Sequence, residues 1–274
     1  MQNIYGLDKS KKYEYIDEYL LNIRSKGRFS FTFEELKNTF DSSEQAIRKK
    51  ISRLKADNKI AIVRKDFYIV IPPEYSDKGT LPLYLYIDDL MNYLDREYYI
   101  GLYSAAALYG AAHQQPMEYQ IIVRKTMRDF VVGDTKINFF FRKTWEQYNI
   151  EKKKSAAGYF NVSSPELTAL DFMSFNGKIG GISRIVTILE ELIEEMKPSR
   201  MYKTASTYPQ NSALQRLGYL LDKIFNREDL AKSIRRVLKV KSTQNVLLAI
   251  ASPKKGNIDR YWKVDVNIEI ESDL

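Results

Sequence analysis

Residues 43–54 read SEQAIRKKISRL, and they contain the key element of the N-terminal region. The apolar residues Ile47, Ile51 and Leu54 are spaced four and three positions apart, so they fall on one face of a helix. This spacing predicts a helix from about Ser43 to Asp57. The opposite face carries polar and basic side chains that suit base edges and phosphates. The candidate DNA-binding residues of this helix are Ser43, Gln45, Arg48, Lys49, Ser52 and Arg53.

Two further helices are predicted before this basic helix. Residues 11–26 place Tyr and aliphatic side chains at three- and four-residue spacing, which is typical of an amphipathic helix. Residues 29–31 form a short extended piece. Thr32 and Glu35 then have the spacing of a capping box, which predicts the start of a second helix ending near Phe40.

A β-hairpin is predicted after the basic helix. Residues 60–63 and 67–71 are rich in β-forming side chains and flank the charged turn Arg64-Lys65-Asp66. Helix, helix, basic helix and hairpin together describe a winged helix-turn-helix, in which the wing brings Arg64 and Lys65 to the DNA backbone. The alternative is a winged-helix module for protein contact or packing, with a basic face that is merely solvated.

The remaining two hundred residues predict a larger α+β domain. Residues 72–79 are polar and rich in helix breakers, so they suggest a linker between domains at 1–75 and 80–274. The fold class is therefore α+β, an N-terminal winged helix-turn-helix followed by a mixed domain with a helical section near 182–240 and a C-terminal hairpin. Helices are expected at 81–94, 98–112, 165–173, 182–196, 214–224 and 231–239, and strands at 119–123, 130–132, 137–141, 159–162, 246–251 and 262–270.

The net charge of +8 is concentrated in two blocks. Residues 42–65 carry eight basic and two acidic side chains, and residues 197–241 carry eleven basic and three acidic ones. Blocks of this kind can meet phosphate. We therefore consider Arg235, Arg236 and Lys239 as possible secondary phosphate contacts. A solvated lysine-rich surface is the alternative for either block.

Signs of catalytic chemistry are weak. The chain has no cysteine, which excludes disulfides, thiolate metal sites and a cysteine nucleophile. Its one histidine, His113, follows a helix and is more typical of a structural residue. Asp88-Asp89 and Asp134 lack a second carboxylate at metal-binding spacing, and no phosphate-binding glycine loop is present. We expect neither an enzyme, nor a metal, nor a cofactor.

The sequence also gives an expectation for localisation. No apolar run approaches the length needed to span a bilayer, so no membrane association is expected. The first eight residues are polar and lack the apolar core of a signal peptide. A cytoplasmic protein is the simplest interpretation.

Three segments resemble AbiEi-type antitoxins. Residues 98–116 place a small-residue helix before a His-Gln-Gln-Pro loop, residues 162–171 read VSSPELTALD, and residues 43–54 fit the N-terminal module of the family. The wing differs, because it turns at Arg64-Lys65-Asp66 where family members often have glycine.

The resemblance implies an antitoxin of a type IV toxin–antitoxin system used in abortive phage infection. Such a protein represses its own operon by binding operator DNA through the winged helix. It counteracts an AbiEii-like nucleotidyltransferase toxin without requiring a stable complex. Two alternatives stay open: an ordinary winged-helix regulator with a C-terminal sensing or dimerisation domain, and a nuclease or nucleotidyltransferase fused to a DNA-reading domain.

Overall fold

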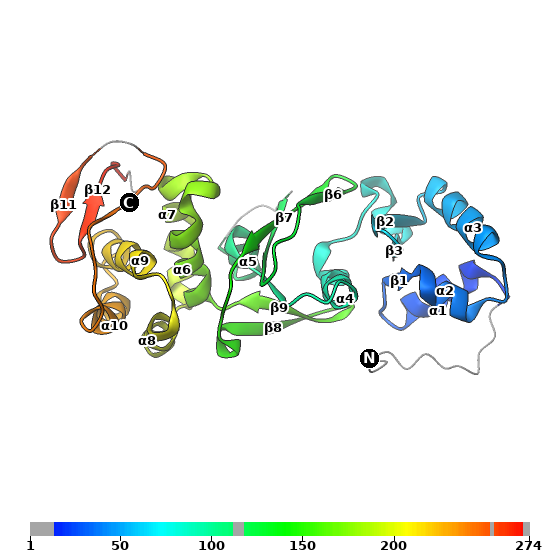
Figure 1. The fold of residues 1–274 in the computed structure, drawn as a ribbon, viewed down its shortest axis with the longest axis horizontal. Coiled ribbons are helices and arrows are strands. Elements are labelled where there is room, and N and C mark those ends of the chain that lie inside the picture. Colours follow the sequence, from blue (N-terminus) through cyan, green and yellow to red (C-terminus); the bar gives the residue numbers. More distant parts are fainter. Residues whose placement is uncertain (1–13, 112–117, 253–254, 271–274) are drawn as a thin grey trace. The chain divides into compact units, whose positions relative to one another are not determined.

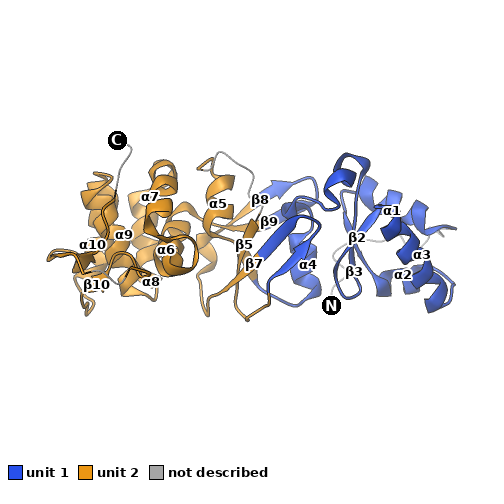
Figure 2. Ribbon diagram, turned by 90° about the horizontal axis from the view of Figure 1, so that it is seen from above, with its two compact units in different colours: residues 1–97, 129–137, 153–160 blue, residues 98–128, 138–152, 161–274 orange. Residues whose placement is uncertain are grey.

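The computed structural model describes residues 14–111, 118–252 and 255–270, which fall into two compact units. Figure 2 colours the first unit, residues 1–97, 129–137 and 153–160, blue and the second, residues 98–128, 138–152 and 161–274, orange. Within the described residues, no helix has the length and apolar character to cross a lipid bilayer.

The first unit begins with the expected winged helix-turn-helix (Figure 1). Its three strands form an antiparallel sheet of order β1-β3-β2. The hairpin of β2 and β3 is the wing, and α3 is the basic helix. The elements are α1 Ile16–Ser25, β1 Ser30–Thr32, α2 Phe33–Thr39, α3 Glu44–Ala56, β2 Ile60–Arg64 and β3 Phe67–Val70.

Local signals fix the limits of α2 and α3. The Thr32 side chain accepts a hydrogen bond from the Glu35 amide, and the Glu35 side chain accepts one from the Thr32 amide, so the predicted capping box is confirmed. Ser43 caps α3 through its hydroxyl. Ile47, Ile51 and Leu54 are buried in the core of the module, as the spacing predicted. Their burial turns the opposite face of α3 to solvent.

The rest of the first unit differs in part from the prediction. Residues 72–79 form a 3₁₀ helix, Pro73–Lys78, rather than an irregular linker. The expected helix at 81–94 is a 3₁₀ turn, Leu83–Leu85, followed by the short α4, Ile87–Tyr93. Tyr86, with φ −144° and ψ −2°, separates the two because this backbone conformation is not helical.

A six-stranded sheet has the order β6-β7-β5-β4-β9-β8. β4 runs antiparallel to β5 and parallel to β9, and β6 and β7 form the predicted hairpin around Gly133-Asp134. β8 was not predicted, because its lysine-rich sequence lacks clear apolar alternation, although lysines are common in edge strands. The strands are β4 Tyr98–Ile100, β5 Glu118–Val123, β6 Phe130–Val132, β7 Thr135–Phe141, β8 Ile150–Ser155 and β9 Gly158–Ser163.

The predicted helix at 98–112 was wrong at its start. Tyr98–Ile100 is the buried strand β4, and the helix α5 covers only Leu102–Leu108. The chain passes close to β5 at Gly101, where a Cβ atom would lie 2.8 Å from the Ile122 side chain. Pairing with strands distant in sequence has overridden the helical propensity of this tyrosine- and alanine-rich stretch.

The helical section packs into one apolar core with the C-terminal strands. α8 was not predicted, because only Met201, Thr204 and Ala205 are buried in it and they make a weak apolar stripe. The core also includes Trp262, which lies against Gly218 of α9 where any side chain would clash. The helices are α6 Pro165–Phe175, α7 Gly181–Leu192, α8 Pro198–Thr207, α9 Asn211–Lys223 and α10 Glu228–Leu238.

A C-terminal hairpin is present, but its first strand differs from the expected one. β11 Asn257–Asp259 pairs antiparallel with β12 Val264–Val266, whereas β10 Val246–Leu247 runs parallel to β12. The Asn267 side chain bonds both the amide and the carbonyl of Ala249, at 2.9 Å each. Residues beyond Leu247 are therefore held by a side chain instead of continuing the strand.

Candidate nucleic-acid interface

The predicted contact residues of α3 lie together on its outer face. Every one of them is exposed, while Ile47 and the other apolar residues face inward. The Ser43 hydroxyl accepts a hydrogen bond from the Ala46 amide at 3.3 Å, so this residue positions the start of the helix. The exposed residues are Ser43, Gln45, Arg48, Lys49, Ser52 and Arg53.

Arg48 is held in place by two neighbours. Its guanidinium lies 4.0 Å from the centre of the Phe33 ring, and its Nη1 lies 3.4 Å from Oδ1 of Asp66 in the wing. The side chain nevertheless remains 53% exposed. Arg48 is thus an oriented cation that stays available at the surface between α2, α3 and the wing.

The other cations of this region divide into paired and unpaired groups. Lys50 and Lys59 both pair with Asp17 of α1, and Lys37 lies 2.7 Å from Glu44. The hydrogen bond from Lys50 is the main cause of the lowered pKa of Asp17.

Lys49 and Arg53, by contrast, form no ion pair within the part of the chain that the structure describes. Carboxylates therefore neutralise the flank of α3 and leave the centre of its outer face positive. This centre is where phosphates and base edges would meet the helix.

The wing turns at Asp66, whose φ is +59°. Aspartate is one of the few residues besides glycine that adopts this left-handed conformation readily, so Asp66 forms this turn without a glycine. The Lys65 carbonyl accepts a hydrogen bond from the Tyr93 hydroxyl at 3.1 Å, and the Lys65 side chain is exposed. The turn is tight and presents one lysine.

Arg64 is placed differently from Lys65. Its guanidinium lies 3.9 Å from the ring centre of Phe130 in β6. Burial there lowers the pKa of Arg64 below its ordinary value. The structure therefore exposes Lys65 at the turn of the wing, while the neighbouring Arg64 packs against Phe130 of β6.

The secondary phosphate candidates on α10 also differ from one another. Arg235 lies 4.2 Å from the Tyr261 ring centre and donates a hydrogen bond to the Tyr261 carbonyl at 2.9 Å, so it helps to fix the C-terminal strands. Arg236 lies over the ring of Tyr202 in α8 and is exposed, as is Lys239.

The weak catalytic candidates take structural places. Asp89 accepts a hydrogen bond from the Ser30 hydroxyl, and Asp88 accepts one from Asn92 within α4. Asp134 lies in the turn between β6 and β7. His113 and the loop at 112–117 lie outside the described residues. In the ranges that the structure describes, no group of three or more acidic, His or Cys residues could hold a metal.

A buried polar network in the second unit was missed by the sequence analysis. Arg142 contacts both the carboxylate of Asp171 and the hydroxyl of Tyr208, and all three side chains are buried. The Tyr99 hydroxyl donates to Asp171 Oδ2 at 2.7 Å. Burial and the nearby Asp171 raise the pKa of Tyr99, which keeps its hydroxyl protonated as a donor.

A second network surrounds Glu166. Its buried carboxylate accepts a hydrogen bond from the Lys197 amide at 3.1 Å and lies 3.7 Å from Arg200. Arg200 also lies 2.8 Å from Glu151, which accepts a hydrogen bond from Tyr109. Glu166 and Asp171 both belong to the segment 162–171, so this segment ties α6 to its neighbours. The signal for this role was a pair of acids in an otherwise apolar helix.

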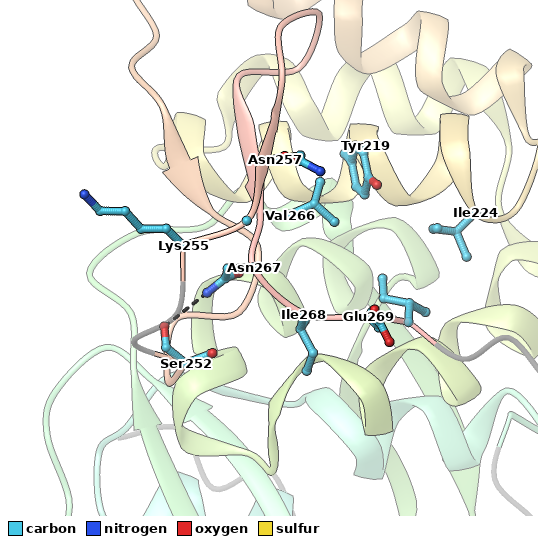
Figure 3. Close-up of a pocket in the computed structure, with 11 residues that line it drawn as sticks. Tyr219, Ile224, Ser252, Lys255, Asn257, Val266, Asn267, Ile268 and Glu269 are labelled. Carbon is cyan, nitrogen blue, oxygen red and sulfur yellow. Dashed lines mark hydrogen bonds between the residues drawn. The ribbon is translucent and has the colours of Figure 1, made fainter.

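An open hollow of about 1010 Å³ lies beside the C-terminal strands (Figure 3). Tyr219 of α9 and Ile224, the residue after this helix, line one side, and Asn257 and Val266 another. The Asn267 amide on its wall donates to the Ser252 carbonyl at 3.1 Å, so it holds the chain instead of facing a ligand. Among the described residues that line the hollow, no hydroxyl is hydrogen-bonded to a basic side chain.

Comparison with known proteins agrees with this architecture. Residues 99–223 match the family described as the AbiEi antitoxin C-terminal domain. The fold is similar to that of the RV2827C protein from Mycobacterium tuberculosis, with a TM-score of 0.65 and 15% identity over 93% of this chain and 92% of that chain. At this identity the similarity shows the fold alone. No curated protein matches the chain significantly.

Proposed function

We propose that this chain, a member of the AbiEi antitoxin family by its domain at residues 99–223, is a type IV antitoxin that represses its own operon. The antitoxin role is supported by that domain. The repressor role is supported by one observation above all, the unpaired positive centre on the outer face of α3.

The winged helix supplies the geometry for reading operator DNA. α3 would enter the major groove, where Arg48 and Arg53 can bind guanine and Gln45 can bind adenine. Lys49 would neutralise the backbone, and Lys65 would contact it from the wing. Phe33 and Asp66 orient Arg48 before DNA arrives, which reduces the entropy lost on binding.

The two proposed activities belong to different parts of the chain. Residues 1–75 would bind DNA, and residues 80–274 would carry the antitoxin activity. The counterpart is an AbiEii-like nucleotidyltransferase toxin, which the chain counteracts without a stable complex. We propose a cytoplasmic protein that has no catalytic activity of its own.

Co-expression tests both roles. The gene next to this one, placed under an inducible promoter, should arrest growth, and co-expression of this chain should restore it. A reporter driven by the chain's own promoter should be repressed by the parent but not by Arg53→Ala.

Different failures have different meanings. Repression without rescue would favour an ordinary winged-helix regulator with a sensing or dimerisation domain. Rescue without repression would remove the operator claim and leave the antitoxin role intact. Absence of both would contradict the proposed function.

A further inference from the structure

A basic and aromatic surface lies on the second unit, where α8 packs against α10 (Figure 1). We define this α8–α10 surface by residues that are all exposed. Two are tyrosines and three are cations. The α8–α10 surface consists of Tyr148, Tyr202, Lys203, Arg236 and Lys239.

Contacts between these residues make the surface continuous. Lys203 Nζ lies 3.9 Å from the Tyr148 ring centre, and the Tyr148 hydroxyl donates to the Lys203 carbonyl at 3.0 Å. Tyr202 is the neighbour of Lys203 in α8. Its ring centre lies 4.7 Å from the Arg236 guanidinium. Lys239, the C-cap residue of α10, follows Arg236 by three residues, a spacing that places the two on the same side of the helix.

Nearby cations are neutralised, but those of the α8–α10 surface are not. Lys232 of α10 lies 2.7 Å from Glu228, and Arg227 lies 3.1 Å from Asp229. Lys203, Arg236 and Lys239 have no acidic partner among the residues that the structure describes. The surface therefore keeps an uncompensated positive charge.

The combination of charge and rings indicates the kind of partner. Tyr148 and Tyr202 are 36% and 38% exposed, so part of each ring is open to solvent. An acidic protein or the backbone of a duplex would use the cations alone. A single strand uses both, because its phosphates meet cations and its unpaired bases stack on aromatic or guanidinium planes.

We propose that the α8–α10 surface binds single-stranded nucleic acid. Lys203, Arg236 and Lys239 would contact successive phosphates, and bases would stack at Tyr202 and Tyr148. This binding is separate from operator recognition, since it uses the second unit and requires no duplex. It would give the antitoxin domain a nucleic-acid ligand of its own.

Fluorescence anisotropy with the full chain tests the proposal. The probes are an RNA of about 12 nucleotides without self-complementarity, within the site sizes of single-strand grooves, the DNA of the same sequence, and the corresponding DNA duplex. The RNA and DNA strands show which sugar is preferred. The variant Arg236→Gln/Lys239→Gln should bind the preferred strand more weakly, with a salt slope about 1.4 units flatter, since each phosphate contact contributes about 0.7.

Substitution of one ring tests stacking independently of charge. Tyr202→Ala should weaken single-strand binding about 5- to 100-fold, whereas Tyr202→Phe, which keeps the ring, should bind like the parent. Lys232→Gln is the matched control, because it removes a cation of the same helix that Glu228 already neutralises. Circular dichroism melting of each variant checks that the fold is retained.

Two results would overturn the proposal. One is equal single-strand affinity for the parent, Tyr202→Ala and the Arg236/Lys239 variant. The other is weaker duplex binding by these variants with unchanged single-strand binding, which would make the surface a second duplex contact. Lys49→Gln/Arg53→Gln in α3 should reduce duplex binding alone, so failure of operator recognition is distinguished from failure of this proposal.

Discussion

The guanidinium of Arg48 lies 4.0 Å from the centre of the Phe33 ring, so this arginine of the basic helix packs on a side chain of the helix before it. Asp66 holds the same arginine from the wing. Arg53, five residues further along α3, has no such restraint among the described residues. The outer face of α3 thus combines one oriented arginine with one that is free to adapt.

Arg53 provides the sharpest test of base recognition. Arg53→Ala should weaken binding to operator DNA by about 1–3 kcal/mol, the value of a good bidentate contact to guanine, and relax the preference at one base pair. Competition binding with single-base operator variants measures both effects. Lys50→Ala is the control, since Lys50 is paired with Asp17 on the flank of the helix. Equal losses in the two variants would contradict the assignment.

Lys65 tests the wing. Lys65→Ala should lower affinity for every DNA sequence and reduce the salt slope by about one unit, because one phosphate contact is lost. Lys59→Ala removes a lysine near the base of the wing that already pairs with Asp17, and it should leave the slope nearly unchanged. The measurement is the binding constant at several salt concentrations. An unchanged slope for Lys65→Ala would show that the wing does not touch the backbone.

Asp66 tests the turn of the wing. At φ +59°, Asp66→Val should reduce the free energy of unfolding by about 1–3 kcal/mol, because a β-branched residue is strained there. Asp66→Gly fits this conformation and loses only an exposed ion pair, so it should stay within about 1 kcal/mol of the parent. Urea unfolding measures both values. Equal stability of the two variants would mean that the turn has another conformation.

The buried pair of Arg142 and Asp171 tests the structural role of segment 162–171. Arg142→Met should cost about 3–5 kcal/mol of unfolding free energy, because it leaves the Asp171 carboxylate buried without its cation. Arg184→Met is the control, an exposed arginine that also lies over a tyrosine ring, and its effect should be within about 0.5 kcal/mol. A small effect of Arg142→Met would show that the network contributes little.

The N-terminal module could be predicted because its signals are local. The Thr32 capping box and the apolar stripe of α3 each lie within a few residues, and each formed as expected. Strand β4 could not be predicted in the same way. Its residues have helical neighbours, and only pairing with β5 and β9 makes them extended.

The candidate site shows the same limit. The apolar spacing in α3 predicts which face of the helix is exposed, but it cannot show which cations on that face already have an acidic partner. Asp17, which neutralises Lys50, is more than thirty positions away in the sequence. Phe130, which covers Arg64, and Tyr261, which holds Arg235, are also distant from their partners. Contacts of this kind depend on the tertiary fold alone.

The most direct test of the central claim is the binding of the purified chain to DNA from its own promoter, compared with a scrambled fragment of equal length and composition. Titrations at several salt concentrations should show tighter binding to the promoter at each of them, with affinity for both fragments falling as salt rises. Equal affinity for promoter and scrambled DNA at every salt concentration would contradict the claim that the winged helix recognises an operator.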